Sequence, residues 1–210
     1  RYPLLEPVQF ADGTIDHVTV ATTRPETMLG DTAVAINPND PRAATLRGAQ
    51  VRLPIVGRIV PLIEDDYVVL PDPESADEKA RFSSGFLKVT PAHDPNDWEI
   101  GLRFNLPVIN VMAPDGSISR EYGWPGEEFE SGAAREAEEF LGASREDARV
   151  AIVKWFEARG LLGEVKPYRH AVGHSYRSHV PIEPYLSDQW YVKVTAVSYT
   201  HLTLPTILLV

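Results

Sequence analysis

Hydrophobic and polar residues alternate in several short segments of the first half of the chain. Residues 18–22 alternate β-branched side chains with a period of two, which predicts a strand that ends before Pro25. Further short strands are predicted at 51–56, 58–63, 67–70 and 86–89. A near-continuous apolar run at 108–112 predicts a buried strand, and the Pro-Asp-Gly that follows predicts a turn at 113–116.

Helical patterns are fewer and begin later. Asp94 is placed to cap a helix, with Pro95 at its first position, Asp97 at its third, and Ile100 and Phe104 on its inner face.

A second helix is predicted to begin after Ser144 and to stop at Gly160. Its expected buried stripe is Val150, Val153 and Phe156, and a short helix is expected before it at 136–141. Several short strands with two or three helices inserted late predict a β-rich α+β domain.

Composition narrows the class of protein. A length of 210 residues with 43% hydrophobic content suits one globular domain with a smaller appendage. The absence of cysteine excludes disulfides and thiolate metal sites and favours a reducing, cytoplasmic compartment. We expect neither a signal peptide nor a membrane span. The net charge of -10 argues against a protein that coats nucleic acid, but it allows a local grip on one end of an RNA.

The segment 88–97 concentrates the candidate chemistry in the order Lys-Val-Thr-Pro-Ala-His-Asp-Pro-Asn-Asp. Lys88 and Thr90 alternate on the incoming strand and therefore point to one face. Asp94 and Asp97 are typical of a helix start, so their carboxylates either satisfy helix amides or bind a ligand. A second polar segment, 22–27, reads Thr-Thr-Arg-Pro-Glu-Thr, and the two together suggest a pocket for a small, charged, hydroxylated ligand.

We expect no metal site. His93 beside two acids lacks the paired-ligand spacing of zinc sites and suits a packed residue of the turn. His170, His174 and His179 are spaced too irregularly to share one helix face.

Long strings of the chain resemble class I valyl-tRNA synthetases. Residues 22–35 and 88–97 are similar to the two editing peptides of these enzymes, and residues 173–178 and 182–193 to the segment that leads back into their synthetic domain. Isoleucyl and leucyl relatives typically carry a Thr-Thr-Thr-Pro-Trp peptide, and isoleucyl enzymes usually have histidine in place of Lys88. The resemblance therefore favours the valyl family. The Ser-Ser-Gly-Phe-Leu at 83–87 departs from the more usual Gly-Thr-Gly-Ala-Val, which suggests a slightly altered pocket wall.

The resemblance implies an editing domain with a barrel-like β core at 1–167 and a return segment at 168–195. Residues 196–210 carry no charge and resemble translated adapter sequence, so we interpret them as a non-native tail. The family's ATP-binding signatures are absent, so ATP and Mg²⁺ are expected only in the parent enzyme's synthetic domain. The expected partners are the rest of the synthetase chain and the 3′ end of tRNA(Val) carrying threonine, with the protein a monomer.

The implied reaction is hydrolysis of the threonyl ester by a positioned water, assisted by the tRNA's ribose hydroxyl. Asp97 is expected to pair with the substrate ammonium, and Thr90 and Asp94 are the candidates to meet the threonine hydroxyl. The expected catalytic residues are Asp97, Lys88, Thr90 and Asp94, and the expected substrate-binding residues are Thr22, Thr23, Arg24, Glu26, Thr27 and His93. Alternatives left open are a non-catalytic acceptor-end binding module, an isoleucyl or leucyl editing domain, and a free-standing trans-editing hydrolase.

Overall fold

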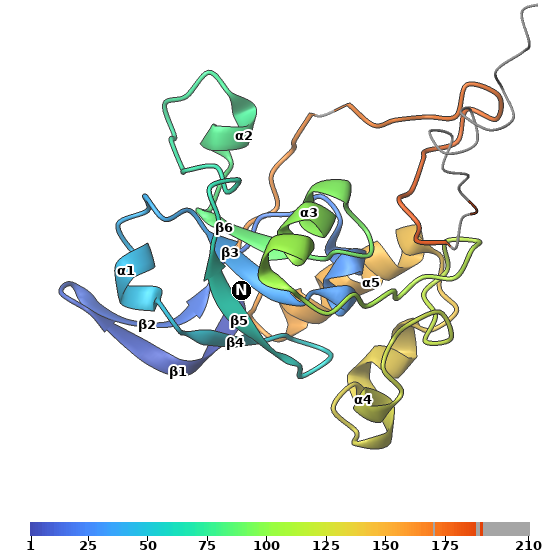
Figure 1. Ribbon diagram of the computed structural model, residues 1–210, viewed down its shortest axis with the longest axis horizontal. Coiled ribbons are helices and arrows are strands. Elements are labelled where there is room, and N and C mark those ends of the chain that lie inside the picture. The colour runs from blue at the N-terminus through green and yellow to red at the C-terminus, as the bar shows by residue number, and fades with distance from the viewer. Residues whose placement is uncertain (170, 188–189, 191–210) are drawn as a thin grey trace, which may run out of the picture.

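One mixed sheet organises the computed structural model, which describes residues 1–169, 171–187 and 190 (Figure 1). Its strand order is β2-β1-β4-β5-β3-β6. The strands are β1 (Tyr2–Phe10), β2 (Gly13–Val18), β3 (Ala33–Ile36), β4 (Gln50–Arg52), β5 (Ile59–Glu64) and β6 (Phe86–Val89).

Neighbouring strands of this sheet are antiparallel except for one pair. β3 runs parallel to β5 with Val34 opposite Leu62, and it runs antiparallel to β6 with Val34 opposite Lys88. The sheet forms an open half-barrel with β2 and β6 at its edges. The predicted β-rich α+β fold is confirmed.

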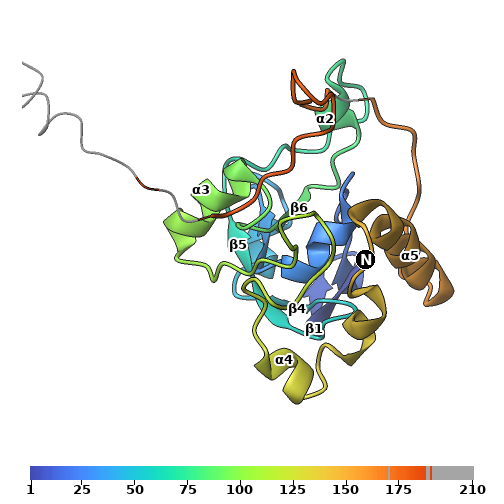
Figure 2. The same ribbon diagram turned by 90° about the vertical axis from the view of Figure 1, so that its right-hand side faces the viewer.

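Short helices surround the sheet, with α3 on one side and α5 on the other (Figure 2). Among the residues that the structure describes, only α3 and α5 extend over several turns. The helices are α1 (Ala43–Leu46), α2 (Glu78–Arg81), α3 (Pro95–Phe104), α4 (Glu127–Glu130) and α5 (Arg145–Ala158), with 3₁₀ helices η1 (Pro25–Gly30) and η2 (Arg135–Phe140). No helix of the described part is both long and apolar enough to cross a membrane.

Strand β3 separates two apolar cores. Successive side chains of a strand point to opposite faces. Val34 and Ile36 therefore join the large core, whereas Ala33 and Ala35 join a smaller core with Ile100 of α3. Because every residue of β3 is buried, polar residues just before it and on β6 are enclosed as well.

Both long helices begin where the sequence predicts. The Asp94 carboxylate accepts hydrogen bonds from Asn96 N at 2.8 Å and Asp97 N at 3.3 Å. Ser144 Oγ accepts one from Asp147 N at 3.1 Å. The turn at 113–116 is confirmed by a hydrogen bond from Gly116 N to Ala113 O, the strand at 86–89 by β6, and the short helix near 136–141 by η2. The strand expected at 58–63 is shifted by one residue to β5.

Two predicted strands have the wrong bounds. The strand expected at 18–22 ends at Val18, because its partner β1 begins at Tyr2, opposite Val18. The strand expected at 51–56 ends at Arg52, because Ile55 is left-handed at φ 70° and Gly57 N bonds Leu53 O, which closes a turn.

Two other predicted strands are wrong. In both segments, side chains form hydrogen bonds with backbone N–H or C=O groups that would otherwise pair with a neighbouring strand. At 67–70, the Val68 carbonyl accepts from Asn37 Nδ2 at 2.7 Å. At 108–112, Val111 N donates to His93 Nε2 at 3.1 Å and Met112 N to Asn110 Oδ1 at 3.0 Å. The run at 108–112 is largely buried without being part of the sheet.

The buried faces of the helices differ from the predicted ones in part. Val150 on α5 is 55% exposed, and the face that packs inward is Ala148, Ile152, Trp155 and Phe156. Ile100 is buried as expected, but Phe104 is exposed at the end of α3. Helical spacing admits several stripes, and the neighbouring elements decide which one is covered.

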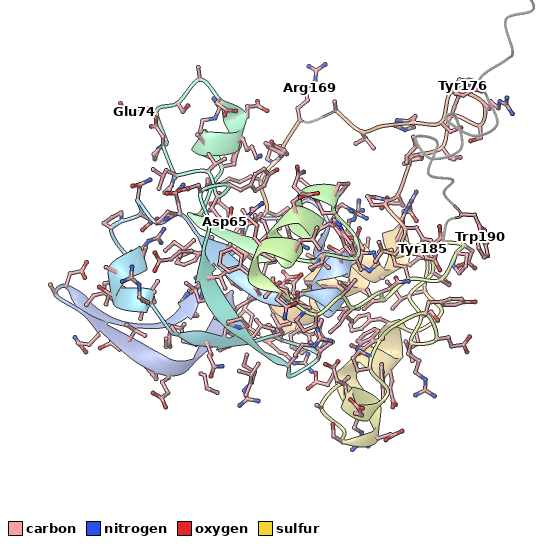
Figure 3. All side chains as sticks on the ribbon, viewed as in Figure 1. Asp65, Glu74, Arg169, Tyr176, Tyr185 and Trp190 are labelled. Carbon is pink, nitrogen blue, oxygen red and sulfur yellow. The ribbon has the colours of Figure 1, made fainter. Side chains whose placement is uncertain are left out.

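The segment after α5 forms a long loop outside the sheet, and it contacts the rest of the protein through Tyr168, which packs on Phe82, and through Glu183, which pairs with Arg24 and Arg145 (Figures 1 and 3). Tyr176 and Trp190 lie on it well apart from the core, and Tyr176 is 80% exposed. Within this segment only one isolated bridge, between His174 and Pro181, is formed by described residues. Residues 191–195 of the expected return segment and the expected tail at 196–210 lie outside the described residues.

Candidate functional site

The two polar segments meet at the end of β6. The upstream segment forms η1, and the downstream segment joins β6 to α3. Arg24 Nη1 donates to His93 O at 2.8 Å, which ties the residue before η1 to the turn before α3. The expectation that both segments contribute to one site is consistent with this contact.

Lys88 and Thr90 share one face, as predicted, and they are enclosed by a residue that sequence reasoning missed. Lys88 Nζ donates to Thr90 Oγ1 at 2.6 Å and to Asp31 Oδ1 at 3.3 Å. The Thr90 hydroxyl donates to Asp31 Oδ1, and the Tyr2 hydroxyl donates to Asp31 Oδ2 at 2.7 Å. All four side chains are buried. We call these residues, Tyr2, Asp31, Lys88 and Thr90, the Asp31 network.

Asp31 is the centre of this network. Burial raises the pKa of its carboxyl, and the charge of Lys88 and the hydrogen bonds from Thr90 and Tyr2 oppose that rise. Its position just before the apolar run of β3 was the signal available in the sequence, because an acid at the entrance of a buried strand is itself enclosed. Tyr2 is distant in the sequence and had no such signal.

Asp97 lies where β6 leads into α3. It is 5% exposed, and its Oδ2 accepts from Thr90 N at 2.8 Å. Burial raises the pKa of Asp97 to about 6, with the positive charge of Lys88 acting in the opposite direction. A carboxylate at the third position of a helix also faces favourable backbone dipoles. Asp97 is therefore an acid that changes charge near neutral pH.

His93 is packed into the turn, as expected of a structural residue. It is buried, and its Nε2 accepts the hydrogen bond from Val111 N. Burial, together with the charges of Lys88 and Arg24, lowers the pKa of His93 to about 3. The imidazole is thus neutral at physiological pH. Because Nε2 accepts, we assign the proton to Nδ1, which is buried with no hydrogen-bond partner among the described residues.

The remaining upstream residues divide into exposed and buried sets. Thr22 and Thr23 are exposed, and Thr22 Oγ1 accepts from Arg24 N at 3.0 Å. The buried Thr27 hydroxyl donates to Arg24 O at 3.0 Å and so closes the first turn of η1. Arg24 also forms an ion pair with Glu183 of the segment after α5.

Glu26 is bound by an arginine of α5. It is fully buried, and it accepts two hydrogen bonds from Arg149 of α5, at 2.9 and 2.7 Å. Arg24 Nε lies 3.7 Å from the same carboxylate. The bidentate contact docks α5 against η1, and Glu26 thereby supports the polar segment from behind.

We expect Arg149→Met to lower the free energy of unfolding by about 1–3 kcal/mol, because it leaves the buried Glu26 carboxylate without its two hydrogen bonds. Urea denaturation at pH 7 measures the change. Arg47→Met is the matched control, since Arg47 pairs with Glu64 at the surface, and its expected change is much smaller because water screens an exposed ion pair. Equal losses in the two variants would contradict the docking role of Glu26.

The chemistry of the site is that of charge and hydrogen bonding. Arg24, Lys88, Asp94 and Asp97 gather two cations and two acids around the start of α3. In the part of the chain that the structure describes, no group of three or more His, Asp or Glu side chains is arranged to hold a metal ion. The hydroxyls of Thr22, Thr27 and Thr90 form hydrogen bonds, and none of their partners in these bonds is a histidine.

Comparison of the sequence with known proteins indicates which class of protein the chain resembles. No protein-family profile matches the chain. The valine--tRNA ligase of Protochlamydia amoebophila is 44% identical over 198 residues, which are 94% of this chain and 18% of that protein. The valine--tRNA ligase of Synechocystis sp. has the same identity and coverage, and that of Halalkalibacterium halodurans is 43% identical over 206 residues, or 98% of this chain and 20% of that protein.

A solved structure is also similar in part. It is the ternary LeuRS-tRNA-LeuAMS complex from Agrobacterium radiobacter K84, with a TM-score of 0.44 and 19% identity over 76% of this chain and 19% of that one.

The chain corresponds to one part of an aminoacyl-tRNA synthetase. Within that class it matches valine--tRNA ligases along almost its whole length, which confirms the resemblance carried by the two polar segments. The chain spans about a fifth of the length of these relatives.

Proposed function

We propose that this chain is an editing domain that hydrolyses the ester of threonine mistakenly attached to tRNA(Val), within a parent enzyme that attaches valine with ATP. The observation that carries the proposal is Asp97: a nearly buried carboxylate at the start of α3, bonded to Thr90 N. A buried carboxylate with few partners is suited to receive a cation such as the α-ammonium of an aminoacyl ester.

The chemistry of valine and threonine explains the need for such a domain. A hydrophobic pocket built for valine cannot strongly reject threonine, and valyl-tRNA synthetases are themselves the established example, with about 10²-fold discrimination. A second, polar pocket can instead favour threonine over valine. A polar group that threonine pairs and valine leaves unpaired costs about 1–3 kcal/mol for valine.

We assign roles from the geometry of the site. Asp97 pairs with the substrate ammonium, and Arg24, held by His93 O, contributes a cation to the same site. Asp94 is partly exposed, with one oxygen committed to the helix amides, so we assign its other oxygen to the threonine hydroxyl. Thr90 is fully buried and therefore acts through Lys88 rather than by direct contact.

The other residues complete the proposed pocket at different depths. Thr22 and Thr23 line its exposed edge, whereas Thr27 and His93 shape the two turns from inside. Glu26 holds η1 against α5.

Hydrolysis requires a water molecule at the ester carbonyl. Neutral His93 is enclosed and bonded to Val111 N, so it is not placed to act as a general base. We therefore assign the water's activation to the free ribose hydroxyl of the tRNA, with the protein contributing orientation of the aminoacyl group. Asp97 would fix one end of that group through its ammonium.

Deacylation by the chain tests the proposal. We expect it to hydrolyse Thr-tRNA(Val) at least tenfold faster than Val-tRNA(Val), measured by the loss of labelled amino acid from tRNA. Binding of both RNAs without turnover would instead identify a module that holds the acceptor end. Faster turnover of Val-tRNA(Ile) than of Thr-tRNA(Val) would indicate an isoleucyl-type editing domain.

A further inference from the structure

The Asp31 network leaves one hydrogen-bond donor available for a ligand. The Lys88 ammonium has three N–H donors, and Asp31 and Thr90 take two of them. The Thr90 hydroxyl donates its only proton to a hydrogen bond with Asp31, so it accepts a hydrogen bond from Lys88 through a lone pair. One Lys88 N–H has no partner among the described residues.

Asp31 determines this direction of hydrogen bonding. As an ionised carboxylate it can only accept, so Thr90 must donate to it and must accept from Lys88. Tyr2 of β1 donates to the second oxygen of Asp31 and so also holds the carboxylate in place. Asp31 itself is fully buried and has no surface for a ligand to contact.

The stability of the fold alone does not explain why Asp31 and Lys88 form a buried ion pair. A buried ion pair loses much of its Coulomb gain to desolvation, and packed apolar residues of similar volume are often as stable or more so. Lys88 retains 7% of its surface, whereas Asp31 and Thr90 retain none. The network therefore fixes the orientation of one buried ammonium and leaves one of its N–H groups unpaired.

We propose that Asp31 is a positioning residue for specificity: through Thr90 and Lys88 it presents a single free N–H to the hydroxyl of the substrate side chain. The proposal rests on the proposed editing function. Threonine pairs this N–H through its hydroxyl oxygen, but valine has only a methyl group there and leaves the N–H unpaired. The unpaired donor costs about 1–3 kcal/mol, or about fivefold to over 100-fold in selectivity.

The test is the ratio of kcat/KM for Thr-tRNA(Val) to that for Val-tRNA(Val) in Asp31→Asn. Asparagine has nearly the same shape, but it removes the charge that holds Lys88 and adds an N–H₂ donor toward the network. We expect the ratio to fall at least fivefold, because turnover of the threonyl ester decreases more than that of the valyl ester. An unchanged ratio, or equal losses for both esters, would overturn the proposal.

Two further variants separate this role from a general loss of structure. Asp65→Asn is the matched control, because Asp65 is also a buried aspartate paired with an arginine, Arg103, but lies outside the network; its ratio should be unchanged. Tyr2→Phe removes one hydrogen bond to Asp31 and should lower the ratio in the same direction by a smaller factor. If Asp31→Asn does not fold, an unchanged ratio in Tyr2→Phe overturns the proposal.

A binding measurement distinguishes this inference from the proposed function. Non-hydrolysable threonyl and valyl amides of 3′-amino-3′-deoxyadenosine report selectivity without turnover. We expect the wild-type chain to prefer the threonyl compound and Asp31→Asn to lose that preference. Wild-type preference that persists in Asp31→Asn would reject the role of Asp31 alone, whereas no preference in the wild type would reject the proposed function as well.

Discussion

Replacing Asp97 with asparagine is expected to lower kcat/KM for deacylation of Thr-tRNA(Val) at pH 7.5 by at least about 30-fold. The proposed pairing of Asp97 with the substrate ammonium is a buried charge contact, and removing one partner of such a contact costs about 2–5 kcal/mol. Asparagine keeps an oxygen that can accept from Thr90 N, so the junction between β6 and α3 should be retained. Single-turnover deacylation measures the effect, and near-normal hydrolysis would contradict the role of Asp97.

The pH profile provides an independent control for this variant. Because the pKa of Asp97 is about 6 and the ionised form is the active one, wild-type activity should fall as the pH decreases through 6. His93, with a pKa of about 3, does not change charge in this range. Asp97→Asn should lose the decrease near pH 6, whereas Glu99→Gln, an exposed acid on the same helix, should keep it.

Replacing Lys88 with methionine is expected to lower the free energy of unfolding at pH 7 by about 3–5 kcal/mol. The change removes the cation beside Asp31 and leaves a fully buried carboxylate with only the hydroxyls of Thr90 and Tyr2. Urea denaturation followed by circular dichroism measures the loss.

A double variant separates the cost of the unpaired charge from the loss of function. Lys88→Met with Asp31→Asn contains no uncompensated charge, so it should recover more than half of the lost stability. It should not recover selectivity for threonine, because the N–H that Lys88 presents is still absent. A double variant that is no more stable than Lys88→Met would contradict the ion-pair account.

Local signals in the sequence were sufficient for several elements of this fold. Asp94-Pro95 and Ser144 mark helix starts through contacts within three residues, and both caps are formed as predicted. The common face of Lys88 and Thr90 also follows from strand geometry alone.

Elements that depend on distant partners were not predictable in this way. The apolar run at 108–112 is typical of a strand, yet His93 captures Val111 N and the run stays outside the sheet. Val150 suits a buried stripe on α5, but it is exposed, and its neighbour Arg149 binds the distant Glu26. In both cases one hydrogen-bonding partner far along the chain outweighs a local pattern.

The sequence by itself determined the family, the two polar segments and the helix starts, because long matching strings and capping contacts are local properties of the chain. Only the tertiary structure decided which polar residues are free to act. It enclosed Thr90, turned Glu26 toward α5 and placed Asp31 and Tyr2 beside Lys88. The physical reason is that a buried polar group must find its partners wherever the fold brings them, and Glu26 and its partner Arg149 are 123 residues apart in the chain.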